Sequence, residues 1–216
     1  MNEALKATKL DFCLVKPYLK GFRFAVVMVA ATVVINKSLT FGVAFTEIIS
    51  TMLIAYPFSI SENNGMDKMY GILPVSKKHL VIGRYLFTCS IGLLVSLFST
   101  VIYSILLRVL GVTVPLPEIC MAAMLGFVIF SFYTVFQLPG FYKYGVLKGK
   151  TFMYIPIVVY MALMFVLFKF DAASGWFFSL IAGNPIVTGI AVLSVCIGAY
   201  WISVTASIRA LQNKEA

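Results

Sequence analysis

The stretch that most resembles a site of chemistry is GVLKGKT, from Gly145 to Thr151. A phosphate-binding loop has the form GxxxxGK[ST], in which backbone N–H groups, a lysine and a hydroxyl surround the phosphates. GVLKGKT has one residue too few between its glycines, and no strand-like run precedes it. We therefore expect no nucleotide site here and interpret its lysines as surface charges.

Metal and nucleophile chemistry also lack the side chains that they need. His79 is the single histidine, so a metal site built from several histidines is excluded. The four cysteines are far apart and form no CxxC pair: Cys13, Cys89, Cys120 and Cys196. A Ser-His-Asp arrangement would need His79, which has no acid at an obvious position. We expect no catalytic, cofactor-binding or metal-binding residue in this chain.

Glu47 is an acid within a long apolar run. A carboxylate at membrane depth costs several kcal/mol unless it is paired or protonated, so it should face other helices or water. One interpretation is a cavity group that binds a cationic substrate or pairs with a basic side chain. The alternative is a carboxylate satisfied by the hydroxyls of Thr46 or Ser50, or by water from outside.

Hydroxyl side chains recur along the third apolar run, which favours either of two interpretations. Small hydroxyl residues promote close helix packing in membranes, and they could also line a polar conduit. The residues concerned are Ser90, Ser96, Ser99, Thr100 and Ser104. Together with Glu47, we regard Ser96, Ser99 and Thr100 as a candidate translocation cavity.

The composition requires lipid as the surrounding solvent. Of the 216 residues, 61% are hydrophobic and 12% charged, and the mean hydropathy is +0.99. Soluble domains average roughly 45–50% apolar and 25% charged residues. The net charge of +9 then serves membrane orientation and lipid contact, so nucleic acid is not an expected partner. No composition shift or repeat divides the chain, which predicts a single domain over residues 1–216.

Six apolar stretches are each near the ~20 residues that span a bilayer. We predict an all-α, polytopic membrane protein with spans at Leu19–Ile35, Leu39–Ile60, Val81–Leu107, Ile119–Leu138, Phe152–Phe168 and Ile186–Ile208. The first two should form a tight hairpin through residues 36–38. Pro156 falls in the first turns of the fifth span, where a membrane helix tolerates it.

The distribution of Lys and Arg predicts the orientation. With six spans, 17 basic residues divide so that only Lys37, Arg108 and Lys169 lie on the side opposite the N-terminus. Cytoplasmic segments carry the excess of Lys and Arg. We therefore expect both termini in the cytoplasm.

Two segments on the expected cytoplasmic side are amphipathic. Leu10, Cys13 and Leu14 recur at helical spacing before Pro17, which predicts an interfacial helix in the headgroup plane. Between the second and third spans, residues 66, 69, 70 and 73 form one apolar helix face, and a proline at 74 ends it. Such a short helix can rest on lipid or fit a groove in a partner protein.

Two motifs resemble a known family. KLDF (Lys9–Phe12), a two-span hairpin and ILPVSKKHLVIGRYL (Ile72–Leu86) resemble the type-two ATP-binding-cassette (ABC) permeases. The closest similarity is to the small six-span permeases of bacterial exporters for phenol-soluble modulins and other amphipathic or antimicrobial peptides.

The resemblance implies a single ABC-type permease domain in the bacterial cytoplasmic membrane. Two permease subunits, identical or paralogous, would assemble with two ATPase subunits, which bind ATP-Mg in place of this chain. The segment between spans two and three would be the coupling helix that contacts the ATPase. Its candidate residues are Met66, Asp67, Met69, Tyr70, Leu73, Pro74, Lys77 and Lys78.

Three other functions stay open. A permease that expels peptide antibiotics for self-protection would have the same sequence features as a peptide exporter. An integral membrane protein without transport would need no ATPase. An intramembrane enzyme would need a nucleophile or metal cluster at membrane depth, and the sequence offers none.

Overall fold

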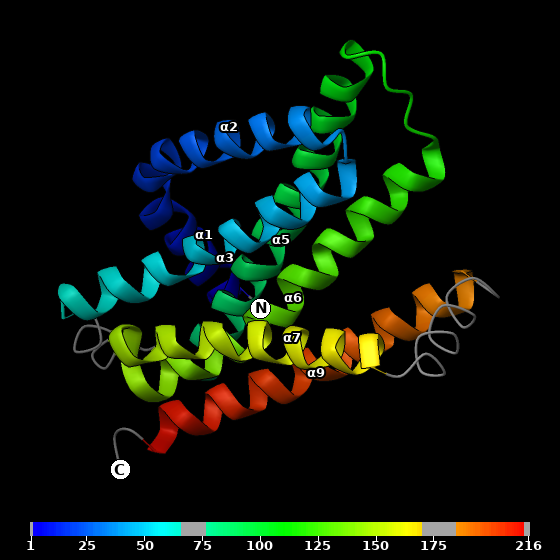
Figure 1. Cartoon of the computed structure of the whole chain (residues 1–216). Helices are drawn as coiled ribbons and strands as arrows, with labels where there is room; N and C mark the ends of the chain where they lie inside the picture. The colour runs from blue at the N-terminus through cyan, green and yellow to red at the C-terminus, as the bar shows by residue number, and fades with distance from the viewer. Residues whose placement is uncertain (1, 66–76, 170–184, 214–216) are drawn as a thin grey trace.

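The computed structural model of the chain describes residues 2–65, 77–169 and 185–213. Every element within these ranges is helical, and Figure 1 shows the long helices gathered into one bundle. The elements are α1 (Asn2–Val15), η1 (Lys16–Tyr18), α2 (Leu19–Asn36), α3 (Leu39–Asn63), α5 (Lys77–Val109), α6 (Leu116–Gly149), η2 (Lys150–Met153), α7 (Tyr154–Lys169) and α9 (Pro185–Asn213).

The predicted hairpin between the first two spans is confirmed. Lys37 ends α2 in the left-handed conformation at φ 50°, and its N–H donates to the Val33 carbonyl. Ser38 then begins α3 as its N-cap, its hydroxyl oxygen accepting from the Phe41 N–H at 3.4 Å. This hydroxyl satisfies one of the backbone donors that a helix start leaves unpaired. Pro17 lies in the short η1 turn that separates α1 from α2.

The far end of α5 is closed by a glycine. Gly111 has φ 79°, and the N–H groups of Gly111 and Val112 donate to the carbonyls of Arg108 and Leu107. This pair of bonds is the Schellman motif, in which a residue of positive φ returns two N–H groups to the last helical turn. Helix α6 follows after Pro115, so α5 and α6 are joined by a short, defined turn.

Helix α6 continues well beyond Leu138, where the sequence predicted the fourth span to end. A proline inside a helix leaves the carbonyl four residues earlier without its N–H donor. For Pro139 that carbonyl belongs to Val135, and the Ser203 hydroxyl of α9 donates to it at 2.8 Å. The lost backbone bond is therefore replaced by a side chain from another helix, and α6 passes through the proline.

Five helical stretches in the described residues are long and apolar enough to cross a membrane: Glu3–Asn36, Leu39–Asn63, Lys78–Val109, Leu116–Ala162 and Ala191–Asn213. The fourth has 47 residues, which is roughly twice a bilayer span. It contains the predicted fourth span and most of the fifth, and it is interrupted at Gly145 by a non-helical φ of 75° and ψ of −179°. The fold is thus an all-helical, multi-pass membrane bundle.

The buried apolar side chains form two clusters at opposite ends of this bundle. One includes Phe58, Phe87 and Phe141 and lies where α3 and α6 end and α5 begins. We call this the basic end, because α1, the start of α5 and the end of α6 bring lysines to it. The other cluster includes Val33, Leu39 and Tyr103, near the α2–α3 hairpin. Figure 1 shows α2 and α9 at opposite edges of the bundle.

Candidate functional site

The two motifs that carry the family resemblance meet at the basic end. Asp11 and Phe12 of KLDF lie on α1, and each faces a residue of the first turns of α5. The Asp11 carboxylate lies 3.8 Å from Nε of Arg84, and the rings of Phe12 and Phe87 pack edge to face with centroids 4.9 Å apart. Contacts from Gly83, Arg84 and Tyr85 reach four other helices, and we name these three residues the GRY hub.

Gly83 sets how closely α1 approaches α5. A Cβ at this position would lie 2.7 Å from the Ala4 carbonyl oxygen and 2.7 Å from the Ala7 Cβ. The Thr8 hydroxyl lies 2.9 Å from the Gly83 carbonyl and 2.9 Å from the Ala4 carbonyl of its own helix, so its one proton is shared between the two oxygens. Small residues on both helices therefore let the two backbones touch, as they do in membrane helix pairs generally.

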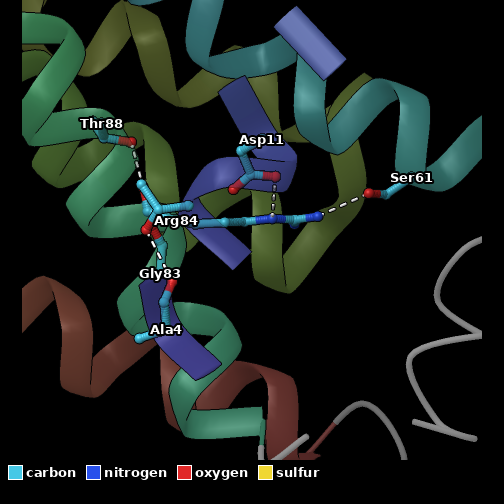
Figure 2. Close-up of polar contacts among 7 residues, drawn as sticks. Ala4, Asp11, Ser61, Gly83, Arg84 and Thr88 are labelled. Atoms are coloured by element: carbon cyan, nitrogen blue, oxygen red, sulfur yellow. Dashed lines mark hydrogen bonds and ion pairs between the residues drawn. The ribbon is translucent and has the colours of Figure 1, made fainter. Parts of the chain in front are cut away.

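Arg84 joins three helices to α5 through one guanidinium, and Figure 2 shows its contacts with Asp11 of α1 and Ser61 of α3. It faces Asp11 of α1, and its Nη2 donates to the Ser61 hydroxyl of α3 at 2.8 Å. Its Cζ lies 4.2 Å from the centroid of the Phe58 ring, in cation–π geometry, and 5.9 Å from that of Tyr142 of α6. Arg84 is 5% exposed and Asp11 2% exposed. Both side chains are thus buried, and removing Arg84 would leave the Asp11 carboxylate buried without this ionic contact.

Tyr85 binds α5 to α9 and, through it, to α6. Its hydroxyl lies 2.6 Å from the Ser203 hydroxyl and 2.8 Å from the Ser207 hydroxyl. Ser203 gives its one proton to the Val135 carbonyl, so Tyr85 must donate to Ser203 and accept from Ser207. The hydroxyl chain therefore has one direction, and it ends on the carbonyl that Pro139 leaves free.

His79 fastens the beginning of α1 to the beginning of α5. Its Nδ1 lies 3.2 Å from the Glu3 carboxylate, and both side chains are exposed by close to half. In the part of the chain that the structure describes, no three side chains among His, Cys, Asp and Glu are arranged to hold a metal ion. The pair contributes to the position of α1 rather than to a metal site.

Most of the predicted coupling residues lie outside the described residues. These are Met66, Asp67, Met69, Tyr70, Leu73 and Pro74. Lys77 is the first residue of α5, and Lys78 is exposed. The GRY hub follows Lys77 by about two helical turns, so the first described turns after the predicted coupling segment lead directly into the hub.

Glu47 lies inside the bundle and is 0% exposed. The Ser50 hydroxyl is 3.1 Å from Oε2 of Glu47, whereas Oε1 has no hydrogen-bond partner among the described residues. The structure thus contains the contact with the Ser50 hydroxyl, and the choice between a satisfied carboxylate and a cavity group stays a prediction. Thr46 instead bonds the Gly42 carbonyl and the Tyr103 hydroxyl. A Cβ on Gly126 of α6 would lie 3.2 Å from the Glu47 Cγ, so α6 packs directly against this side chain.

The other candidate cavity residues are also buried. Ser96 donates to the Ala123 carbonyl of α6 at 2.7 Å, and Ser99 returns its hydroxyl to the Ser96 carbonyl at 3.2 Å. Thr100 is buried, and its hydroxyl has no partner within the described ranges. Ser96 therefore joins two helices, as the packing interpretation expects, while a translocation cavity at these residues stays a prediction.

The contact between α1 and α5 at the GRY hub could have been predicted from charges and small residues in the sequence. Asp11 and Arg84 are opposite charges beside apolar stretches, and burial of one requires the other. Ala4, Ala7 and Thr8 form a small face on one helix, and Gly83 offers the matching gap on another. Small faces together with paired charges could have placed α1 against α5.

Comparison with known proteins agrees with this architecture. The family described as ABC-2 family transporter protein matches residues 8–212, nearly the whole chain. No curated protein and no solved structure gives a significant match. Membership in this family implies a membrane transport component that works with an ABC ATPase subunit. With its apolar helices and the family match over residues 8–212, the chain belongs to the ABC-2 transporter family as a multi-pass permease component.

Proposed function

We propose that the chain is the permease subunit of an ATP-driven exporter of amphipathic or antimicrobial peptides. Two permeases, identical or paralogous, would assemble with two ATPase subunits in a bacterial cytoplasmic membrane. The family match supports the permease assignment. The KLDF and GRY motifs, which resemble those of peptide exporters, support the substrate class.

The observation that carries this proposal is the position of the GRY hub. Residues 66–76, where the coupling helix is predicted, connect α3 directly to α5. Arg84 lies near the start of α5 and contacts Ser61 near the end of α3, across that same connection. From there Asp11 leads to α1, and Tyr85 leads to α9. A force applied by an ATPase between α3 and α5 would therefore reach most of the bundle through hydrogen-bonded and ionic contacts.

Purification with an ATPase tests the proposal. We expect the chain to copurify with an ABC ATPase encoded next to its gene, and the complex to hydrolyse ATP faster when amphipathic peptides are added. Failure to associate with any such ATPase would argue for a membrane protein without transport. Stimulation by peptide antibiotics alone would favour the self-protection permease.

The coupling helix has its own test. Burial of a Met or Tyr side chain is worth roughly 1.5–3 kcal/mol, so Met69→Asp with Tyr70→Ala should weaken ATPase binding about a hundredfold or more. Lys78→Ala should have a smaller effect, because an exposed charge is screened and replaceable, and Arg209→Ala, at an exposed position outside the predicted coupling segment, is the control. A double variant that retains its ATPase and transports like wild type would make this segment a lipid-resting linker.

The proposal includes six spans with both termini in the cytoplasm. The interruption of the 47-residue stretch at Gly145 supports counting that stretch as two spans. Single cysteines at Ser38, Asp171 and Asn213, in a cysteine-free background, should be labelled by an impermeant thiol reagent in intact cells only at the first two positions. Strong labelling at Asn213 would overturn this topology.

A further inference from the structure

The glycines of GVLKGKT serve a reversal of the chain. Gly145 interrupts α6 at φ 75° and ψ −179°, a backbone region that is essentially restricted to glycine. A Cβ on Gly149 would lie 2.6 Å from the Phe141 ring, and one on Gly140 would lie 2.8 Å from the Phe152 ring. Phe152, in the η2 turn, therefore packs back onto α6, and the chain enters α7 immediately afterwards.

Glu62 of α3 holds this reversal through a hydrogen bond to the backbone of α6, a contact that we call the clasp. The Val146 N–H, the first after the break, donates to Oε2 of Glu62 at 2.8 Å. A Cβ on Gly145 would lie 3.0 Å from Oε1 of the same carboxylate. The break interrupts the helical hydrogen bonding, and a carboxylate is a strong acceptor for the N–H beyond it. Glu62 therefore performs for the second part of α6 what an N-cap side chain does for an ordinary helix.

The last turn of α3 thereby holds two helices at once. Ser61 accepts from Arg84 of α5 at 2.8 Å, and the adjacent Glu62 accepts from Val146 of α6. A cavity of about 50 Å³ lies between them, bordered by Arg84, Tyr142 and Gly145 among others. The clasp thus lies beside free volume and not within a filled core.

Helix α7 depends on this reversal for its direction. Tyr154, Val158 and Met161 are all largely exposed, so within the described residues this part of α7 has little lateral packing against the bundle. The η2 turn that precedes α7 is held more firmly, because the rings of Phe152 in that turn and Tyr144 of α6 are stacked with centroids 5.3 Å apart. A helix without much lateral packing takes its direction from the connection that precedes it.

We propose that Glu62 is a positioning residue for transport, which clasps the α6 break at Gly145 and so transmits movement from the end of α3 to α7. The transport role rests on the proposed permease function, whereas the link between Glu62 and α7 can be measured in the isolated chain. The role requires a hydrogen-bond acceptor at position 62 and no ionised group.

The distance between α3 and α7 tests the link directly. Spin labels at Met52→Cys and Met161→Cys, both exposed sites, are introduced into the cysteine-free chain in lipid nanodiscs. We expect one narrow distance distribution for the parent chain, and a shifted or broadened one for Glu62→Ala and Gly145→Ala. Glu62→Gln, which keeps an acceptor oxygen, and Glu118→Ala, which removes a different exposed acid, should match the parent. A parent-like distribution for Glu62→Ala overturns the link, and an altered one for Glu62→Gln overturns the hydrogen-bond basis.

Transport per ATP hydrolysed tests the positioning role in the same variants. With the ATPase in vesicles, Glu62→Ala should lower peptide transport per ATP by about tenfold, the effect of losing one hydrogen bond from a two-position equilibrium. Glu62→Gln should restore it, which a loss of folded protein would not allow. An altered distance with unchanged transport per ATP overturns the transport role. If the parent chain binds no ATPase, the proposed function fails, and the distance measurement still decides the link.

Discussion

Asp11 and Glu47 are both buried carboxylates, yet their surroundings differ. Asp11 lies at the basic end and faces the buried Arg84. Glu47 lies between α3 and α6, where its side chain receives a hydrogen bond from Ser50. The first carboxylate joins helices through its charge. The second accepts from a hydroxyl of its own helix and has no ion-pair contact among the described residues.

The hydroxyl groups around the two acids are more alike. Near Glu47, the one proton of Ser50 is shared between the carbonyl and the carboxylate of Glu47, while Thr46 bonds the Tyr103 hydroxyl of α5. At the basic end, Ser61 and Ser203 likewise bond to other helices. Both regions therefore have hydroxyl contacts between helices, and among the described residues the basic end adds ion pairs to them. An external force on the basic end would move several helices together.

Removal of Arg84 should produce the largest change. Arg84→Ala leaves Asp11 buried without its ionic partner, which typically costs about 3–5 kcal/mol. We expect a loss of that size in the free energy of unfolding, measured by denaturant titration in detergent micelles. Asp11→Ala combined with Arg84→Ala should recover part of it, and Arg209→Ala, at an exposed position, should stay within about 0.5 kcal/mol of wild type. Equal stability of the single and double variants would show that the pair is not coupled.

Gly83 tests the close approach of α1. Gly83→Ala places a methyl group 2.7 Å from the Ala4 carbonyl oxygen, and overpacking of this kind costs about 1–3 kcal/mol. Gly198→Ala is the matched control, because nothing lies within 4 Å of a Cβ there and alanine favours the helix. Thermal unfolding should separate the two variants in opposite directions. A stabilised Gly83→Ala variant would mean that α1 does not rest on this glycine.

Ser203 tests the hydroxyl chain between α5, α6 and α9. Ser203→Ala removes the donor to the Val135 carbonyl and the acceptor for Tyr85, at a cost of about 1–3 kcal/mol. Ser90→Ala is the control, since within the described ranges that hydroxyl bonds the carbonyl of Leu86 in its own helix and joins no second helix. Chemical unfolding of the two variants should differ by this amount. Indistinguishable unfolding curves would show that the Ser203 hydroxyl does not replace the backbone hydrogen bond that Pro139 removes.

The smallest effect is expected for Glu47→Gln. The amide keeps an oxygen to accept from Ser50, so the unfolding free energy should change by less than about 1 kcal/mol. A loss of more than about 2 kcal/mol in the free energy of unfolding would indicate that Glu47 is ionised and paired. Glu47 and Asp11 would then be held in the same way. Transport by the same variant decides the cavity prediction separately, since unchanged transport would remove Glu47 from it.

Local signals predicted much of the fold. Residues 36–38 predicted the α2–α3 hairpin, and Pro17 predicted the end of α1, because caps and prolines act over a few neighbouring residues. The end of α6 was missed, because the bond that compensates for Pro139 comes from Ser203, far along the chain. The meeting of Asp11 with Arg84 is likewise non-local. In the site, residue types were visible in the sequence, while their partners depended on helix packing.

Pro139 also bears on how the chain is assembled in the membrane. Synthesis proceeds from the N-terminus, so α9 is made after α5 and α6. Until Ser203 arrives, the Val135 carbonyl and the Tyr85 hydroxyl lack the partner that the finished bundle supplies, and lipid offers no substitute. The proline thus leaves a carbonyl without a partner until α9 is in place. Insertion of α9 supplies both missing hydrogen bonds at once, so the order in which the helices are made delays the completion of this contact.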